Sequence, residues 1–99
     1  MKVRWTDIAA ANLEGIYRYI SQNSPNYARM VVDRITNRSI QISQFPLSGR
    51  IVPEMQIDKI REVIEGPYRI IYHIKSGGID IVAVVHGAQR LPWKNEFQP

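Results

Sequence analysis

Residues 61–72 read REVIEGPYRIIY and carry the strongest structural signal in the chain. Their β-branched and aromatic residues predict two strands joined by a turn at residues 65–67. A second turn, at the glycine pair 77–78, precedes another apolar run at residues 79–86. Glycine pairs of this kind join neighbouring antiparallel strands. The second half of the chain is therefore predicted to form an antiparallel sheet, with strands at 59–64, 68–75 and 79–86.

The first half of the chain is predicted to be helical. Residues 2–5 alternate polar and apolar side chains as a short strand does, and Thr6 or Asp7 can then cap a helix that fades near Asn23. Ser24 followed by Pro25 predicts the start of a second helix, which extends to about residue 44. Each helix carries one apolar stripe. The predicted fold class is α+β, a single domain over residues 1–99 with an N-terminal helical hairpin packed on a small, mainly antiparallel sheet.

The composition of the chain excludes several kinds of functional site. The 99 residues include no cysteine, which excludes a disulfide framework and a thiolate metal site. No metal-ligand or phosphate-loop motif is present, so no metal and no cofactor is expected. No signal peptide is visible, and the longest apolar stretch, residues 81–85, is too short to cross a membrane, so a cytoplasmic protein is expected. The net charge of +4 fits an acidic partner such as RNA, DNA or a protein segment, although many small domains carry a similar charge.

Strand parity predicts which side chains share a face of the sheet. A two-residue turn at 77–78 would pair Ser76 with Ile79 and place Arg69 opposite His86. His73 would lie opposite Val82, on the same face as this pair and away from the helices. This face is expected to be uncovered, so that it and an edge strand could dock a partner.

The turn at 65–67 decides the position of Arg61. A three-residue turn would place Arg61 on the face of Arg69, whereas a two-residue turn would place it on the helix side. Because burying an unpaired arginine is costly, the three-residue turn is predicted.

Four motifs in order resemble the RelE/ParE superfamily of bacterial toxins. Besides residues 61–72, these are the last strand with its ending at 82–90, the loop at 45–50 and a helix motif. The helix motif comprises Ala10, Leu13, Ile16, Tyr19 and Ile20. The resemblance implies the toxin of a type II toxin–antitoxin pair, neutralised by an antitoxin segment that wraps it in a hetero-oligomer. The RelE branch cleaves messenger RNA on the ribosome, and the ParE branch inhibits DNA gyrase.

The resemblance also suggests candidate catalytic residues. Arg69 matches the superfamily's arginine in the central strand, and Arg90 lies near the arginine that follows the last strand. His86 could transfer protons near neutral pH, or it could be a structural hydrogen-bonding residue. No tyrosine follows Tyr72, and residues 44–53 lack the paired lysines of RelE-type members. The ending at 86–90 is closer to ParE-like members.

The candidates for binding a target or an antitoxin overlap with these residues. Arg61 and Arg69 could bind phosphate or an acidic segment, or they could pair with Glu62 or Glu65. Trp93 could anchor a partner or fold back onto the sheet. The full set of binding candidates is Arg61, Arg69, His73, His86, Arg90 and Trp93.

Three functions follow from these observations. The first, and the one favoured, is a ParE-like toxin that binds DNA gyrase and has no chemistry of its own. The second is a ribosome-dependent endoribonuclease that uses Arg69, His86 and Arg90. The third is a degenerate member that keeps the fold and binds its antitoxin but is not toxic.

Overall fold

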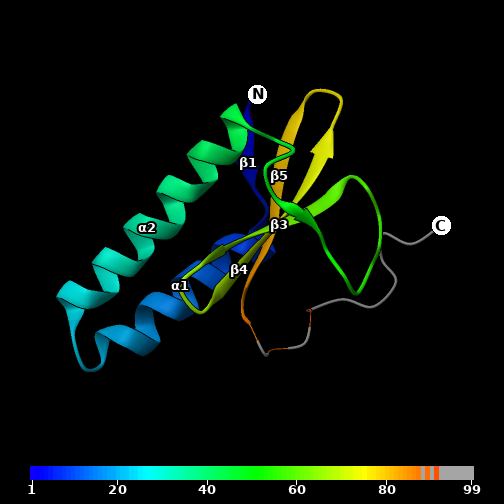
Figure 1. Ribbon diagram of the computed structural model, residues 1–99. Coiled ribbons are helices and arrows are strands. Elements are labelled where there is room, and N and C mark those ends of the chain that lie inside the picture. Colours follow the sequence, from blue (N-terminus) through cyan, green and yellow to red (C-terminus); the bar gives the residue numbers. More distant parts are fainter. Residues whose placement is uncertain (88, 90, 92–99) are drawn as a thin grey trace.

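The computed structural model describes residues 1–87, 89 and 91. Two helices lie against a five-stranded sheet with the strand order β1-β5-β4-β3-β2 (Figure 1). The pair of β1 and β5 is parallel and all other pairs are antiparallel. This arrangement confirms the predicted α+β fold. The elements are β1 (Val3–Trp5), α1 (Asp7–Ser21), α2 (Pro25–Gln44), β2 (Arg50–Ile51), β3 (Ile60–Glu65), β4 (Tyr68–Lys75) and β5 (Gly78–His86).

Both helices begin at the capping residues that the sequence indicates. The Thr6 hydroxyl accepts a hydrogen bond from the Ala9 amide at 3.2 Å, and the Ser24 hydroxyl accepts one from the Tyr27 amide at 3.1 Å. Pro25 follows Ser24 in the first turn of α2, where a missing amide proton costs nothing. No helix in the described part of the chain is long and apolar enough to cross a membrane.

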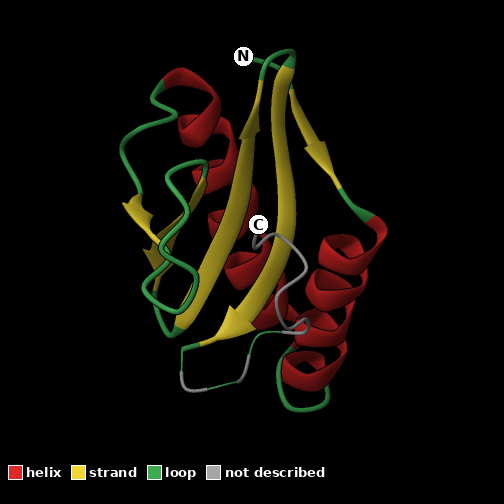
Figure 2. Cartoon of the chain, turned by 90° about the vertical axis from the view of Figure 1, so that its right-hand side faces the viewer, coloured by secondary structure: helices red, strands yellow, loops and turns green. Residues whose placement is uncertain are grey.

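The sheet has a separate hydrophobic core on each face. On one face, α1 and α2 cover a cluster that includes Tyr72 and Ile81. On the other face lies the strap, as we name residues 52–59 between β2 and β3, which packs Val52 and Met55 onto the sheet. Figure 2 shows the strap on the viewer's side of the central strands and α2 behind them. The expectation that this face is uncovered was therefore wrong over the half that the strap occupies.

The pairing of β4 with β5 differs from the prediction. The turn comprises Ser76 and Gly77, so Lys75 pairs with Gly78, and the predicted pairing of Ser76 with Ile79 was wrong. A bulge follows: Tyr72 pairs with Ile81, whereas Ile71 pairs with Ala83. The extra residue, Val82, reverses the parity of the rest of β5.

The bulge decides the position of His86. Arg69 pairs with Val85, and His86 pairs with Tyr68. Val85 packs in the core under the strap, whereas Tyr68 packs against the helix-side core. His86 therefore lies on the helix side of the sheet, and its predicted place opposite Arg69 was wrong. The bulge supplies the physical reason, because it places Ala83 and Val85 in the second core.

The predicted position of Arg61 was also wrong. Glu65 pairs with Tyr68 across a two-residue turn in which Gly66 has a φ of 58°. This register places Arg61 opposite Tyr72, on the helix side. The guanidinium is nevertheless paired, because it donates to the Asp58 carboxylate at 3.0 Å and to the Gly49 carbonyl at 3.0 Å. The cost of an unpaired arginine, on which the prediction depended, does not arise.

Candidate functional site

Arg69 lies buried between two carboxylates. Its Nε donates to Glu62 at 2.7 Å, and its Nη1 and Nη2 donate to the two oxygens of Glu54 at 2.7 and 2.8 Å. Glu62 also accepts a hydrogen bond from the Nε of Arg50 at 2.6 Å. The Glu62 side chain is fully buried, and that of Arg69 is 8% exposed. All three guanidinium nitrogens of Arg69 are thus occupied by carboxylates from the strap and from β3.

This cluster, Arg50–Glu62–Arg69–Glu54, carries two positive and two negative charges. The hydrogen bond to Arg69 is the main reason that the pKa of Glu54 lies below its usual value. The pKa of Arg69 is raised, with the hydrogen bond to Glu54 as the largest cause. Both partners therefore stay charged and neutralise each other. The pairing of Arg69 with Glu62, which the sequence left open, is confirmed, whereas Glu54 was not foreseen.

Tyr72 fixes the loop at residues 45–50. Its hydroxyl donates to the Pro46 carbonyl at 2.7 Å and accepts from the Gly49 amide at 3.0 Å. A Cβ atom at Gly49 would lie 2.5 Å from the Glu62 carbonyl oxygen and 2.5 Å from the Tyr72 hydroxyl. Burial is the main reason that the pKa of Tyr72 is raised, so this phenol stays protonated as a donor. The loop motif is thus explained by packing.

His86 lies beside a hollow between α1 and the ends of β4 and β5. The ring of His86 meets the ring of Tyr68 edge to face, with 6.0 Å between centroids. The hollow has a volume of about 360 Å³, and its lining includes Gly15 and the highly exposed Tyr19 on α1.

His73 lies on the face away from the helices, as predicted. Its ladder partner on β5 is Asp80, and its predicted pairing with Val82 was wrong. Burial is the main cause that lowers the pKa of His73, and the nearby Lys75 acts in the same direction. His73 is therefore mostly neutral at pH 7.

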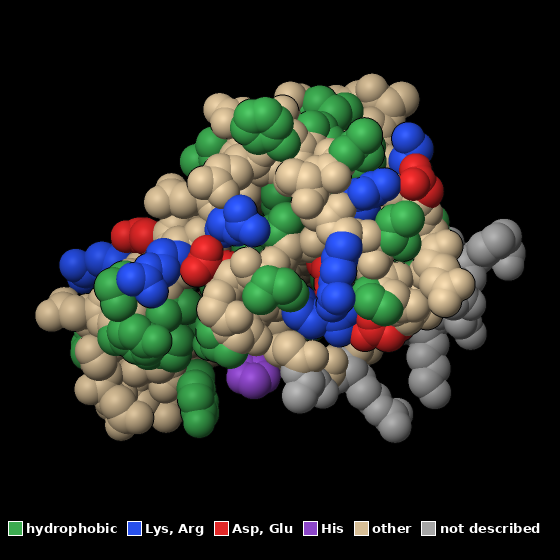
Figure 3. Space-filling view, viewed as in Figure 1, with side chains coloured by type: hydrophobic (Ala, Val, Ile, Leu, Met, Phe, Trp, Pro, Cys, Tyr) green, Lys and Arg blue, Asp and Glu red, His purple; other side chains and the backbone are tan. Residues whose placement is uncertain are grey.

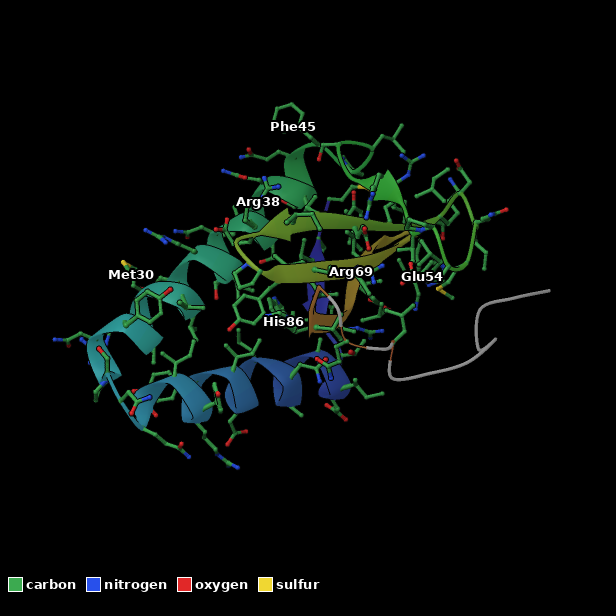
Figure 4. The ribbon with its side chains drawn as sticks, turned by 60° about the horizontal axis from the view of Figure 1, so that its bottom comes forward. Met30, Arg38, Phe45, Glu54, Arg69 and His86 are labelled. Atoms are coloured by element: carbon green, nitrogen blue, oxygen red, sulfur yellow. The ribbon has the colours of Figure 1, made fainter. Side chains whose placement is uncertain are left out.

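The described residues do not bring the catalytic candidates together. Arg69 and His86 lie on opposite faces of the sheet, and Figure 4 shows Arg69 beside Glu54 while His86 lies toward α1. Arg90 and Trp93 lie outside the described residues. Across residues 1–87, 89 and 91, no three histidine, aspartate or glutamate side chains are grouped to hold a metal ion.

Residues 3–91 match the family described as the ParE toxin of the type II toxin–antitoxin system parDE. The chain belongs to the ParE toxin family. It is therefore a type II toxin of the RelE/ParE superfamily, and an antitoxin is its family-wide partner.

Similar proteins and a solved structure agree with membership of the RelE/ParE superfamily. The chain is 34% identical to the putative toxin Y4kP of Sinorhizobium fredii, over 92% of this chain and 93% of that protein. It is 33% identical to toxin RelE2 of Caulobacter vibrioides, over 89% of this chain and 97% of that protein. A chain of the chromosomal ParDE system of P. aeruginosa has a similar structure, with a TM-score of 0.72 and 26% identity. That likeness covers 87% of this chain and 95% of the other.

Proposed function

We propose that this ParE-family toxin stops growth by binding DNA gyrase in the cytoplasm, without chemistry of its own. A cognate antitoxin neutralises it in a hetero-oligomer. The position of Arg69 is the observation that carries this proposal.

Cleavage of RNA needs a free cation at the phosphate and a proton-transfer group on the same side of the scissile bond. Arg69 is not a free cation for a phosphate, since each of its three guanidinium nitrogens already donates to Glu62 or Glu54 and these carboxylates neutralise its charge. His86, the candidate proton-transfer group, lies across the sheet from it. The geometry of the described residues therefore favours binding over catalysis.

The outer surface also suits binding to another protein. Met30, Phe45 and Leu47 are exposed along α2 and the loop that follows it. Figure 3 shows lysine and arginine side chains across the same face, between scattered hydrophobic ones. Exposed apolar groups among positive charges are typical of surfaces that bind acidic partners.

Two assays with purified components test the proposal. The chain is added to a gyrase supercoiling reaction and, separately, to a translation reaction programmed with a defined message. We expect loss of supercoiling with intact messages and continued protein synthesis. Addition of the cognate antitoxin should restore supercoiling.

His86→Ala provides the matched variant. A nuclease that used this imidazole would lose roughly 100-fold or more of its activity. The binding mechanism predicts that the variant still inhibits gyrase. Cleaved messages that depend on His86 would replace the proposal with the ribonuclease function, and inactivity in both assays would support a degenerate, non-toxic member.

A further inference from the structure

A hollow at the turn between β4 and β5 gathers positive charge. It has a volume of about 300 Å³ and lies at the opposite end of β4 from Arg69. Three cationic side chains and one carboxylate line it. We name it the hairpin-end pocket, and its charged residues are Lys2, Arg4, Lys75 and Asp80.

The strand register builds this pocket. Arg4 on β1 pairs with Asp80 on β5, and Asp80 pairs with His73 on β4. Since paired residues share a face, this row lies on the side away from the helices. Lys2 and Lys75 fall on the same side, because each lies two residues from a member of the row. The pocket thus occupies the half of this face that the strap leaves uncovered.

The charges in the pocket do not balance. Asp80 is 7% exposed, and its Oδ2 meets Lys75 Nζ at 2.5 Å and Arg4 Nη2 at 3.2 Å. One carboxylate therefore serves two cations, and Lys2 adds a third. The side chains of Arg4 and Lys75 are 69% and 46% exposed, so both cations face solvent while Asp80 holds them from below.

The main chain at the pocket is also open to a ligand. A Cβ atom at Gly77 would meet nothing within 4 Å. At Gly78 a Cβ would lie 2.6 Å from the Lys2 carbonyl oxygen, so glycine is what allows β1 to approach the turn and bring Lys2 into the pocket. A hollow with an excess of positive charge and bare backbone is suited to a small oxyanion.

We propose that the hairpin-end pocket binds a phosphate of duplex DNA. The choice of DNA rests on the proposed function, because a toxin bound to gyrase lies next to the DNA on which gyrase acts. The pocket shares no lining residue with the exposed apolar positions along α2, so protein and DNA can be contacted through different residues. Arg4, Lys75 and Lys2 neutralise the phosphate, and Asp80 offsets one of these three positive charges.

Binding of a fluorescein-labelled DNA duplex to the full chain, measured by anisotropy over a range of salt concentrations, tests the proposal. The double variant Lys2→Gln/Lys75→Gln should bind roughly tenfold more weakly, and the slope of log K against log salt should fall by about two. The control, Arg29→Gln/Arg34→Gln, removes two charges from the exposed face of α2. It should stay within about twofold of the native chain. Thermal melts confirm that each variant is folded.

Asp80→Asn gives a second and opposite test. Asp80 is the one carboxylate among the described lining residues, so its removal should strengthen DNA binding severalfold, whereas a purely structural ion pair predicts lower stability and no gain in affinity. Equal losses in the pocket variant and the α2 control would overturn the proposal, and so would unchanged or weaker DNA binding by a folded Asp80→Asn chain. Preference for single-stranded RNA over duplex DNA would also overturn it. Because this assay contains no gyrase, it can fail or succeed independently of the supercoiling assay.

Discussion

At the scale of single residues, close packing explains motif residues that could otherwise be mistaken for functional ones. Gly49 is an example, since the loop motif in which it lies is also one of the superfamily's motifs. Its amide hydrogen bond to Tyr72 and its contact with Glu62 leave no room for a side chain. The hydroxyl of Tyr72 and the backbone of β3 thus determine the residue at this position.

We predict that Gly49→Ala lowers the free energy of unfolding by about 1–3 kcal/mol, because the new methyl group must displace Tyr72 or β3. Urea denaturation measures the change. Gly15→Ala is the control: its Cβ meets nothing within 4 Å, and its helical position predicts a gain of about 0.5–1 kcal/mol. Equal stabilities of the two variants would contradict this account.

A second residue-scale prediction concerns pH. The pKa of Glu54 lies below its usual value of 4.5, chiefly through the hydrogen bond to Arg69. A carboxyl whose pKa is lower in the folded state stabilises the fold above its unfolded pKa, and this contribution is lost as pH falls through the folded value. Glu54→Gln should therefore be less stable than the native chain at pH 7, and the difference should shrink below pH 4.5. Thermal melts between pH 7 and pH 3 test this, and a constant difference would argue against the ion pair.

At the scale of elements, local signals determined the helices and non-local packing determined the strand pairing. Ser24 is a cap that the sequence indicates directly, Thr6 is one of the two residues that it offered as the first cap, and α2 has the predicted bounds. The first helix ends at Ser21, slightly before the predicted limit. The pairing of β4 with β5 was missed because a bulge at Val82 leaves no mark in the order of apolar residues. The bulge lets β5 contribute apolar side chains to both cores. The second of these cores also contains the strap, which lies between β2 and β3 in the sequence.

The charged cluster was partly missed for the same reason. The observed two-residue turn at Gly66 and Pro67, which differs from the predicted three-residue turn, places Glu62 on the face of Arg69. The strap has no periodic pattern, so nothing in the sequence indicated that Glu54 returns to the sheet. The face of the sheet on which Arg69 lies was predictable from the sequence, but its hydrogen bonds to Glu54 were not.

The packing of the strap on the sheet should depend on the buried side chain of Met55. Met55 is 8% exposed and packs in the second core. Met55→Ala should lower the free energy of unfolding by about 2–5 kcal/mol, as measured by urea denaturation. Met30→Ala, at an exposed position on α2, is the control and should change stability by less than about 0.5 kcal/mol. Similar losses in both variants would show that the strap is not packed as described.

At the scale of the whole molecule, an antitoxin that binds only the folded chain adds to its stability by mass action. With free antitoxin at 100 times its Kd, the gain is about 2.7 kcal/mol. We therefore expect the melting temperature of the purified toxin to rise with the concentration of its cognate antitoxin. An antitoxin from an unrelated pair serves as the control. No shift with the cognate protein would contradict the expected partnership.

The strap also bears on how long a free toxin lasts in a cell. Among its described residues, the strap is anchored by the ion pairs of Glu54 with Arg69 and of Asp58 with Arg61, by the hydrogen bond from the Ile74 amide to the Lys59 carbonyl, and by a small set of apolar contacts. Segments held by few contacts open locally far more often than the whole molecule unfolds. Cellular proteases cleave chains in such open states, and Lys59 is exposed where the strap meets β3. We therefore expect degradation of the unbound toxin to begin at the strap, so that its half-life follows the strength of the contacts that hold the strap rather than the stability of the sheet.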